Sequence, residues 1–136
     1  MARITPGMRL RGHHLACLTG FTGHGYDPTF TRRLAELAAA WRAGEVVEVV
    51  EGCDDVCASC PWRAGDGCGR HPDADAAVRA QDRAVLAALG RVPGDRTTCA
   101  TVTADLSRPD TREVVLASCG DCSWASVCAF RNPVGP

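Results

Sequence analysis

The sequence has 136 residues, a formal net charge of −1, 46% hydrophobic residues and only 5% aromatic residues. This length corresponds to one domain with a core of modest size, and the near-neutral charge without a basic tail excludes a general nucleic-acid-binding surface. All fifteen basic residues are arginine, so functions that need a lysine, such as a Schiff base or the phosphate-binding lysine of a P-loop, are excluded too.

The first half of the chain predicts a strand, two helices and another strand. Residues 8–11 are expected to be extended, and the apolar segment that follows them to form a short helix. An aspartate–proline pair is a typical helix start and a later glycine a typical stop, so a helix is predicted over 28–43. The valine-rich segment 45–51 then predicts a strand.

The second half of the chain predicts two helices and leaves one segment open. A glycine-rich cysteine loop over 53–71 precedes a helix over 73–89. Residues 96–107 fit a strand by their threonines and a helix by their apolar spacing, and a last short helix begins near Pro109. The expected fold class is α+β: a mainly helical, small single domain over 1–136 with a short strand pair, organised around cysteine-rich metal-binding loops.

Nine cysteines are the most informative feature of the sequence. Six of them form two similar triplets, "CASCPWRAGDGC" from Cys57 to Cys68 and "CGDCSWASVC" from Cys119 to Cys128. The N-terminal segment has no continuous apolar stretch typical of a signal peptide, and no run is long enough to span a membrane. We therefore expect a cytoplasmic protein, in which structural disulfides are rare and clustered thiols are metal ligands.

The spacings C-x2-C-x7-C and C-x2-C-x5-C favour an iron–sulfur cluster over zinc. Three local cysteines with a remote fourth ligand are frequent in [4Fe–4S] proteins, and a proline directly after Cys60 is also found in ferredoxin loops. A zinc site built from two Cys-x-x-Cys pairs stays open, although it would leave Cys68 and Cys128 unused. Trp62 and Trp124 stand two residues after the second cysteine of each triplet, where they either cover a cluster as an apolar lid or fill a small core.

Candidates for a remote ligand are Cys17, Cys53, Cys99 and the histidines. Cys53 lies directly before the first triplet, whereas Cys99 is expected to be a small buried hydrophobic residue away from the metal. His14 precedes Cys17 by three residues, so both share one face of a helix. Metal ligation or proton transfer beside a cluster would explain His14, and so would simple packing or capping.

Four segments, "LRGHHLACLTGF", "VVEGCDDVCASCPW", "RAQDRAVLAALGRVPGD" and "CGDCSWASVC", together resemble domain-of-unknown-function family 1284, a family of small cysteine-rich prokaryotic proteins. The resemblance implies iron–sulfur binding. Carried over by position, it implies a histidine pair at His13 and His14 and the ligands Cys17, Cys57, Cys60, Cys68, Cys119, Cys122 and Cys128. Cys53 stands where the family often has proline, and Cys99 lies outside the family pattern.

Three functions remain open at this point. The first is a [4Fe–4S] protein, with one or two clusters per chain, that transfers electrons to a redox partner protein. The second is an enzyme whose three-cysteine cluster keeps an open iron for Lewis-acid or sulfur-transfer chemistry on a small-molecule substrate, with Arg11, His13 and His14 binding an anionic group and moving protons. The third is a zinc-stabilised interaction module. In each, the metal is expected to contribute to folding, and no membrane is expected as a partner.

Overall fold

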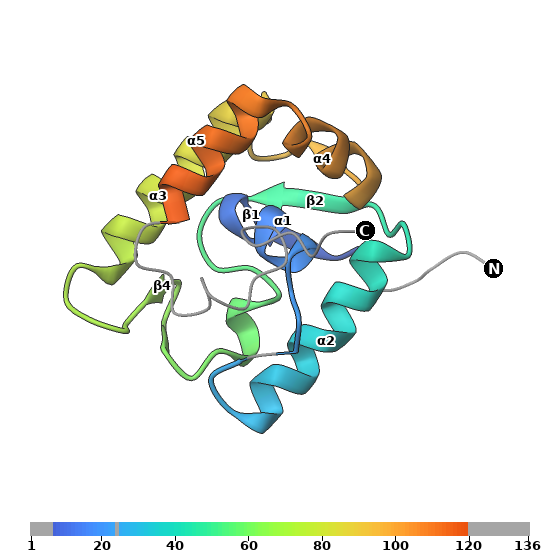
Figure 1. Ribbon diagram of the computed structural model, residues 1–136. Coiled ribbons are helices and arrows are strands. Elements are labelled where there is room, and N and C mark those ends of the chain that lie inside the picture. The colour runs from blue at the N-terminus through green and yellow to red at the C-terminus, as the bar shows by residue number, and fades with distance from the viewer. Residues whose placement is uncertain (1–6, 24, 120–136) are drawn as a thin grey trace.

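The computed structural model describes residues 7–23 and 25–119 of the chain (Figure 1). The helices of this part are α1 (Gly12–Thr19), α2 (Pro28–Arg42), the 3₁₀ turn η1 (Cys57–Ser59), α3 (Ala74–Leu89), α4 (Cys99–Leu106) and α5 (Pro109–Cys119). The strands are β1 (Arg9–Arg11), β2 (Val47–Val50), β3 (Arg63–Ala64), β4 (Gly67–Cys68) and β5 (Arg96–Thr97). The prediction of a mainly helical α+β fold is confirmed.

The strands form a small sheet and a separate hairpin instead of the single strand pair that was expected. β2 lies in the centre of the sheet, parallel to β1 and antiparallel to β5, where Val47 pairs with Thr97. The strands β3 and β4 form a hairpin inside the first cysteine loop. The open segment 96–107 therefore contains both kinds of structure: β5 first, and then α4, which begins after the N-cap residue Thr98.

Local signals account for the two long helices, whose ends lie within one residue of the predicted ones. The side chain of Asp27 accepts a hydrogen bond from the N–H of Phe30 at 2.7 Å and so caps the start of α2. The helix α3 ends at Gly90, whose φ of 68° lies in the left-handed region that glycine adopts without strain. These short-range interactions are why the sequence alone predicted both helices.

The helix α1 is the central element of the fold, with α2, α3 and α4 packed around it, while α5 runs beside α3 (Figure 1). Leu15 and Leu18 of α1 are completely buried, together with Leu10 and Val49 of the sheet and Trp41 of α2. The hydrophobic core is therefore built around α1 and the sheet. As a consequence, the two histidines of α1 are largely, but not completely, buried.

Gly12, the first residue of α1, allows this helix to approach α3 closely. A methyl group on Gly12 would lie 2.5 Å from the carbonyl oxygen of Asp82 and 3.0 Å from its Cα. The backbone N–H of His13 donates to Oδ1 of Asp82 at 2.9 Å, so the same approach also positions the first histidine.

We expect Gly12→Ala to lower the free energy of unfolding by about 1–3 kcal/mol, because the added methyl group would collide with the backbone of α3, which cannot rotate away. Urea denaturation measures the change. Gly7→Ala is the matched control, since a methyl group there meets the carbonyl oxygen of Val46 at an ordinary 3.7 Å. Equal midpoints for the two variants would contradict the role given to Gly12.

Candidate metal centre

The first cysteine loop folds back on itself. Its Cys-x-x-Cys segment forms the turn η1, in which the N–H of Cys60 donates to the carbonyl oxygen of Cys57 at 3.0 Å. The hairpin β3–β4 then reverses the chain and pairs Cys68 with Arg63. The thiol of Cys60 consequently has Cys68 and Cys53 as electrostatic neighbours.

Aspartates hold the backbone of this loop at three of its cysteines. The backbone N–H of Cys53 donates to the side chain of Asp66 at 3.3 Å. In the same way the N–H of Cys57 donates to Asp54 at 3.0 Å, and that of Cys68 to Asp75 at 2.9 Å. Asp75 is itself held by Nε of Arg79 at 2.8 Å. These contacts shape the loop through its own polar groups and leave the cysteine side chains available as ligands.

Two of the loop thiols receive hydrogen bonds at sulfur. Sγ of Cys57 accepts from Nη1 of Arg11 at 3.4 Å, and the thiol of Cys60 accepts from the backbone N–H of Trp62. Burial and the charge of Asp54 nevertheless raise the pKa of Cys57 well above its usual range, and burial also raises the pKa of Cys60. Both groups are therefore thiols at neutral pH, and a metal that binds them must displace their protons.

Asp54 links the loop to the central helix. Its side chain, which is 0% exposed, accepts from the ring Nδ1 of His14 at 2.7 Å and from the backbone N–H groups of Arg11 at 2.7 Å and Cys57 at 3.0 Å. Burial by itself would raise the pKa of Asp54, but the neighbouring His14 and the three donors outweigh it and hold the pKa well below its usual range. Asp54 is therefore ionised, and it orients the ring of His14.

A second buried carboxylate, Asp82 of α3, holds the neighbouring histidine. Oδ1 of Asp82 lies 2.6 Å from the ring Nδ1 of His13, and its Oδ2 accepts from Nε of Arg11, also at 2.6 Å. These contacts lower the pKa of Asp82 against the opposing effect of burial. Burial and the neighbouring His14 lower the pKa of His13, so a neutral imidazole is paired with an ionised carboxylate.

Arg11 connects the two carboxylates and the loop. Its guanidinium group is 1% exposed, and the contacts with Asp82 and Cys57 raise its pKa although burial opposes the charge. Arg11 balances the charge of one of the two buried carboxylates. Asp54 forms no ion pair with an arginine among the described residues, and a metal ion close by would compensate its charge.

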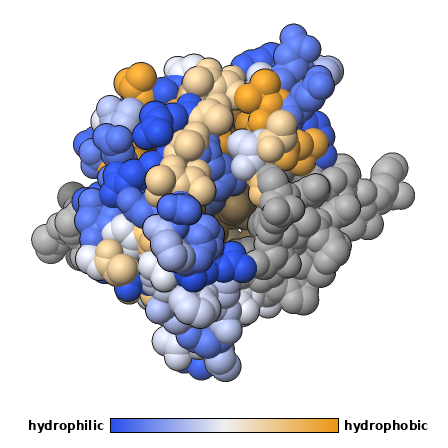
Figure 2. Space-filling view, turned by 90° about the vertical axis from the view of Figure 1, so that its left-hand side faces the viewer, coloured by the Kyte–Doolittle hydropathy of each residue, from blue (hydrophilic) through white to orange (hydrophobic). Residues whose placement is uncertain are grey.

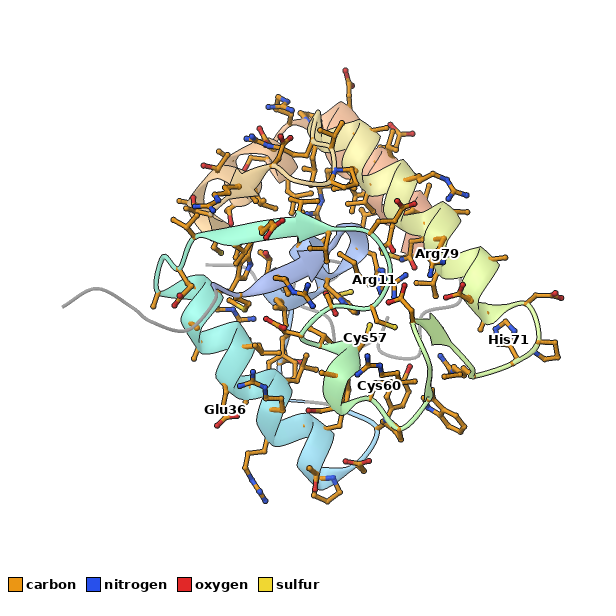
Figure 3. The ribbon with its side chains drawn as sticks, turned by 180° about the vertical axis from the view of Figure 1, so that it is seen from behind. Arg11, Glu36, Cys57, Cys60, His71 and Arg79 are labelled. Carbon is orange, nitrogen blue, oxygen red and sulfur yellow. The ribbon has the colours of Figure 1, made fainter. Side chains whose placement is uncertain are left out.

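One group of three potential ligands emerges from these contacts among residues 7–23 and 25–119. A nitrogen of His14, an oxygen of Asp54 and Sγ of Cys57 all lie within 4.8 Å of one another. Figure 3 shows Arg11, Cys57 and Cys60 close together in the middle of the molecule, whereas His71 lies out on the loop before α3. A thiol beside an imidazole is a donor set for zinc or iron and a poor one for magnesium or calcium.

The other predicted site residues fall into three groups. Cys53, which the resemblance had set aside, belongs to the first loop and lies near Cys60. Cys17 on α1 and Cys119 at the end of α5 are both half-buried, and Cys99 packs against the hydrophobic core. The predicted ligands Cys122 and Cys128, and Trp124 with them, lie outside the described residues.

Trp62 does not fill a small core, which was one of its two interpretations. Its side chain is 42% exposed, and its ring packs edge-on against Tyr26, with ring centroids 6.2 Å apart. A role as an apolar lid over a metal group stays a prediction.

Asp54 and Asp82 organise the site, although neither was among the residues predicted for it. Asp82 occupies the buried face of α3, one turn before Val85 and Leu86. Its position on the helix is one at which the periodicity of α3 predicts an apolar residue. A charged residue at such a position indicates a buried, paired side chain. Asp54 stands three residues before Cys57, the spacing at which an aspartate caps a following turn.

One face of the molecule is mostly polar. Seen from the left-hand side of Figure 1, the described surface is largely hydrophilic, with apolar residues gathered in its upper part (Figure 2). No helix in the described ranges is long and apolar enough to cross a membrane.

Comparison with known proteins gives one match. The family described as "Protein of unknown function (DUF1284)" matches residues 25–128, a segment that contains both cysteine triplets and begins after α1. No curated protein and no solved structure matches the chain.

Proposed function

Because the chain belongs to the DUF1284 family, whose description states no activity, we propose a function from the site itself: the protein binds a [4Fe–4S] cluster through its first cysteine loop and transfers electrons. Cys57, Cys60 and Cys68 are the loop cysteines that would hold the cluster. Cys17, Cys119, Cys122 and Cys128 would serve a second one. When bound, such a cluster accepts and releases one electron.

One buried hydrogen-bond donor without a partner among the described residues supports this proposal. Nη2 of Arg11 is buried and has no hydrogen-bond partner among the described residues, although Nη1 of the same guanidinium group contacts Sγ of Cys57. A buried cationic donor without an acceptor is costly. An iron–sulfur cluster held by Cys57 would supply sulfide acceptors close to this guanidinium group, whereas a zinc ion would supply none. The unsatisfied nitrogen therefore supports a cluster over zinc.

The protein would tune the electron transfer through hydrogen bonds and charge. The guanidinium group of Arg11 and the N–H of Trp62 donate to the sulfurs of Cys57 and Cys60, which stabilises the more negative, reduced state. The buried carboxylates of Asp54 and Asp82 act in the opposite direction. A redox partner protein in a reducing, cytoplasmic setting fits this role.

An enzyme with an open iron is the second candidate, and the histidines favour it. His13 and His14 are neighbours with ring centroids 4.0 Å apart, and each presents its Nδ1 to a buried carboxylate. Their side chains are 15% and 13% exposed, and this partial exposure is what contact with a substrate would require. Such carboxylate–imidazole pairs suit proton transfer to a substrate. Arg11 is too deeply buried to receive that substrate, and we assign it to positioning the site.

An anaerobic preparation of the full chain tests the proposal. We expect about four iron and four sulfide ions per cluster, one or two clusters per chain, and the paramagnetic resonance of a [4Fe–4S] cluster after reduction. Stoichiometric zinc without iron would instead support the zinc-stabilised interaction module. A preparation with neither metal, from cells supplied with both, would refute all three functions.

A further inference from the structure

We propose that His14 is the non-cysteine ligand of the metal centre and that Asp54 is not a ligand but the carboxylate that orients it. This inference rests on the proposed function and identifies a fourth ligand beside Cys57, Cys60 and Cys68. It requires a histidine that is close to the loop sulfurs, fixed in orientation and provided with a free lone pair.

Proximity selects His14. It lies in the first turn of α1, and one of its nitrogens is within 4.8 Å of Sγ of Cys57. The loop and the helix are tied together at this point because the backbone N–H of Arg11 and that of Cys57 donate to the same carboxylate, that of Asp54. The distance between His14 and Cys57 is thus set by the fold and does not depend on a flexible side chain.

The hydrogen bonds of Asp54 favour an orienting role over ligation. Its Oδ2 already accepts from the N–H of Arg11 and from the ring of His14, and its Oδ1 accepts from the N–H of Cys57. Three of its about four lone-pair sites are thereby engaged, and Oδ2, the oxygen in contact with His14, has none left for a metal. A carboxylate that binds the far nitrogen of a histidine is the usual partner of a metal-ligating imidazole.

The contact between Nδ1 of His14 and Oδ2 of Asp54 also determines which ring nitrogen carries the lone pair. Oδ2 of Asp54 also accepts from the backbone N–H of Arg11, so it acts as an acceptor in this contact too. Nδ1 of His14 is then the donor, and Nε2 carries the lone pair that a metal can use. The ring is therefore held in the tautomer that ligation requires. A mobile, solvated histidine would not have this preorganisation.

His13 provides a matched comparison within the same helix. Its ring also binds a buried carboxylate, Asp82, and lies against the ring of His14. It is not part of the group of three potential ligands that includes Cys57. The two histidines thus share chemistry and burial, but of the two only His14 belongs, within the described residues, to a group of potential ligands that contains a loop sulfur.

Pulsed electron paramagnetic resonance on the reduced, anaerobically purified full chain tests the assignment. In protein labelled with ¹⁵N only in histidine, we expect the strong hyperfine coupling of a directly bound nitrogen. This coupling should disappear in His14→Ala and His14→Cys and persist in His13→Ala and His71→Ala. His14→Cys should keep the iron content of the wild type, because a thiolate replaces the imidazole. Asp54→Asn should lose iron to a chelator about 10- to 100-fold faster.

The possible outcomes separate this inference from the proposed function. An intact cluster without nitrogen coupling in the wild type, or coupling that persists in His14→Ala, overturns the role of His14 and leaves the cluster in place. If the His14 variants fail to fold, a wild-type spectrum without nitrogen coupling still overturns the role of His14, and coupling that persists in His13→Ala and His71→Ala still supports it. Zinc in place of iron overturns the proposed function, and the same labelling in cobalt(II)-substituted protein then decides whether His14 is a ligand.

Discussion

Replacing Asp82 by alanine is expected to lower the free energy of unfolding by about 3–5 kcal/mol. The carboxylate of Asp82 compensates the guanidinium group of Arg11 at 2.6 Å, and both side chains are buried. Without it, Arg11 would retain a buried charge with no carboxylate in contact with its side chain, and His13 would lose both of its hydrogen bonds to α3. Chemical denaturation monitored by circular dichroism measures the loss.

An exposed ion pair provides the control for this prediction. Asp105 and Arg108 also lie 2.7 Å apart, but the arginine is 57% exposed, so Asp105→Ala should cost less than about 1 kcal/mol. The double variant Arg11→Met/Asp82→Leu should recover most of the stability lost in Asp82→Ala, because neither charge remains buried. Equal costs for Asp82→Ala and Asp105→Ala would show that the buried pair does not stabilise the fold.

The same carboxylate predicts a pH dependence. The pKa of Asp82 is lower in the folded protein than in the unfolded chain, so its contribution to stability is fully present above the unfolded pKa, about 4. This contribution is lost as the pH falls from there through the folded pKa. The difference in stability between the wild type and Asp82→Asn should therefore be constant near neutral pH and shrink in acid.

Replacing Cys60 by serine is expected to remove the metal of the first loop, with a fall in affinity of more than about 100-fold, since a serine hydroxyl does not replace a thiolate ligand. Iron and zinc counted per chain after anaerobic purification measure the loss. Cys99→Ser is the control, because Cys99 packs against the core and its Sγ lies 3.7 Å from Oγ1 of Thr103. Wild-type metal content in Cys60→Ser would rule out the first loop as the metal site.

The Cys60→Ser variant also shows how far the metal contributes to folding. The buried core is formed mainly by α1, α2, α3 and the sheet, and Val56 is its buried member from the loop that carries the first triplet. Aspartates already hold the backbone of this loop at three cysteines. We therefore expect loss of the metal to destabilise the loop more than the helices around α1.

The sequence by itself determined the features that depend on short-range interactions. The start of α2 follows from Asp27 and the end of α3 from Gly90, because a cap needs only residues within one helical turn. The turn at Cys57–Ser59 and the hairpin that brings Cys68 back toward Cys60 depend in the same way on residues close in sequence.

Only the tertiary structure decided which side chains lie beside Cys57 and how the segment 96–107 divides into a strand and a helix. His14 reaches Asp54 across 40 residues of sequence, and His13 reaches Asp82 across 69. Neither pairing has a local signature, because it depends on how closely α1 packs against the loop and, at Gly12, against α3. The strand β5 likewise forms because β2 lies beside it. Two residues are too few for a strand to be recognised from sequence alone.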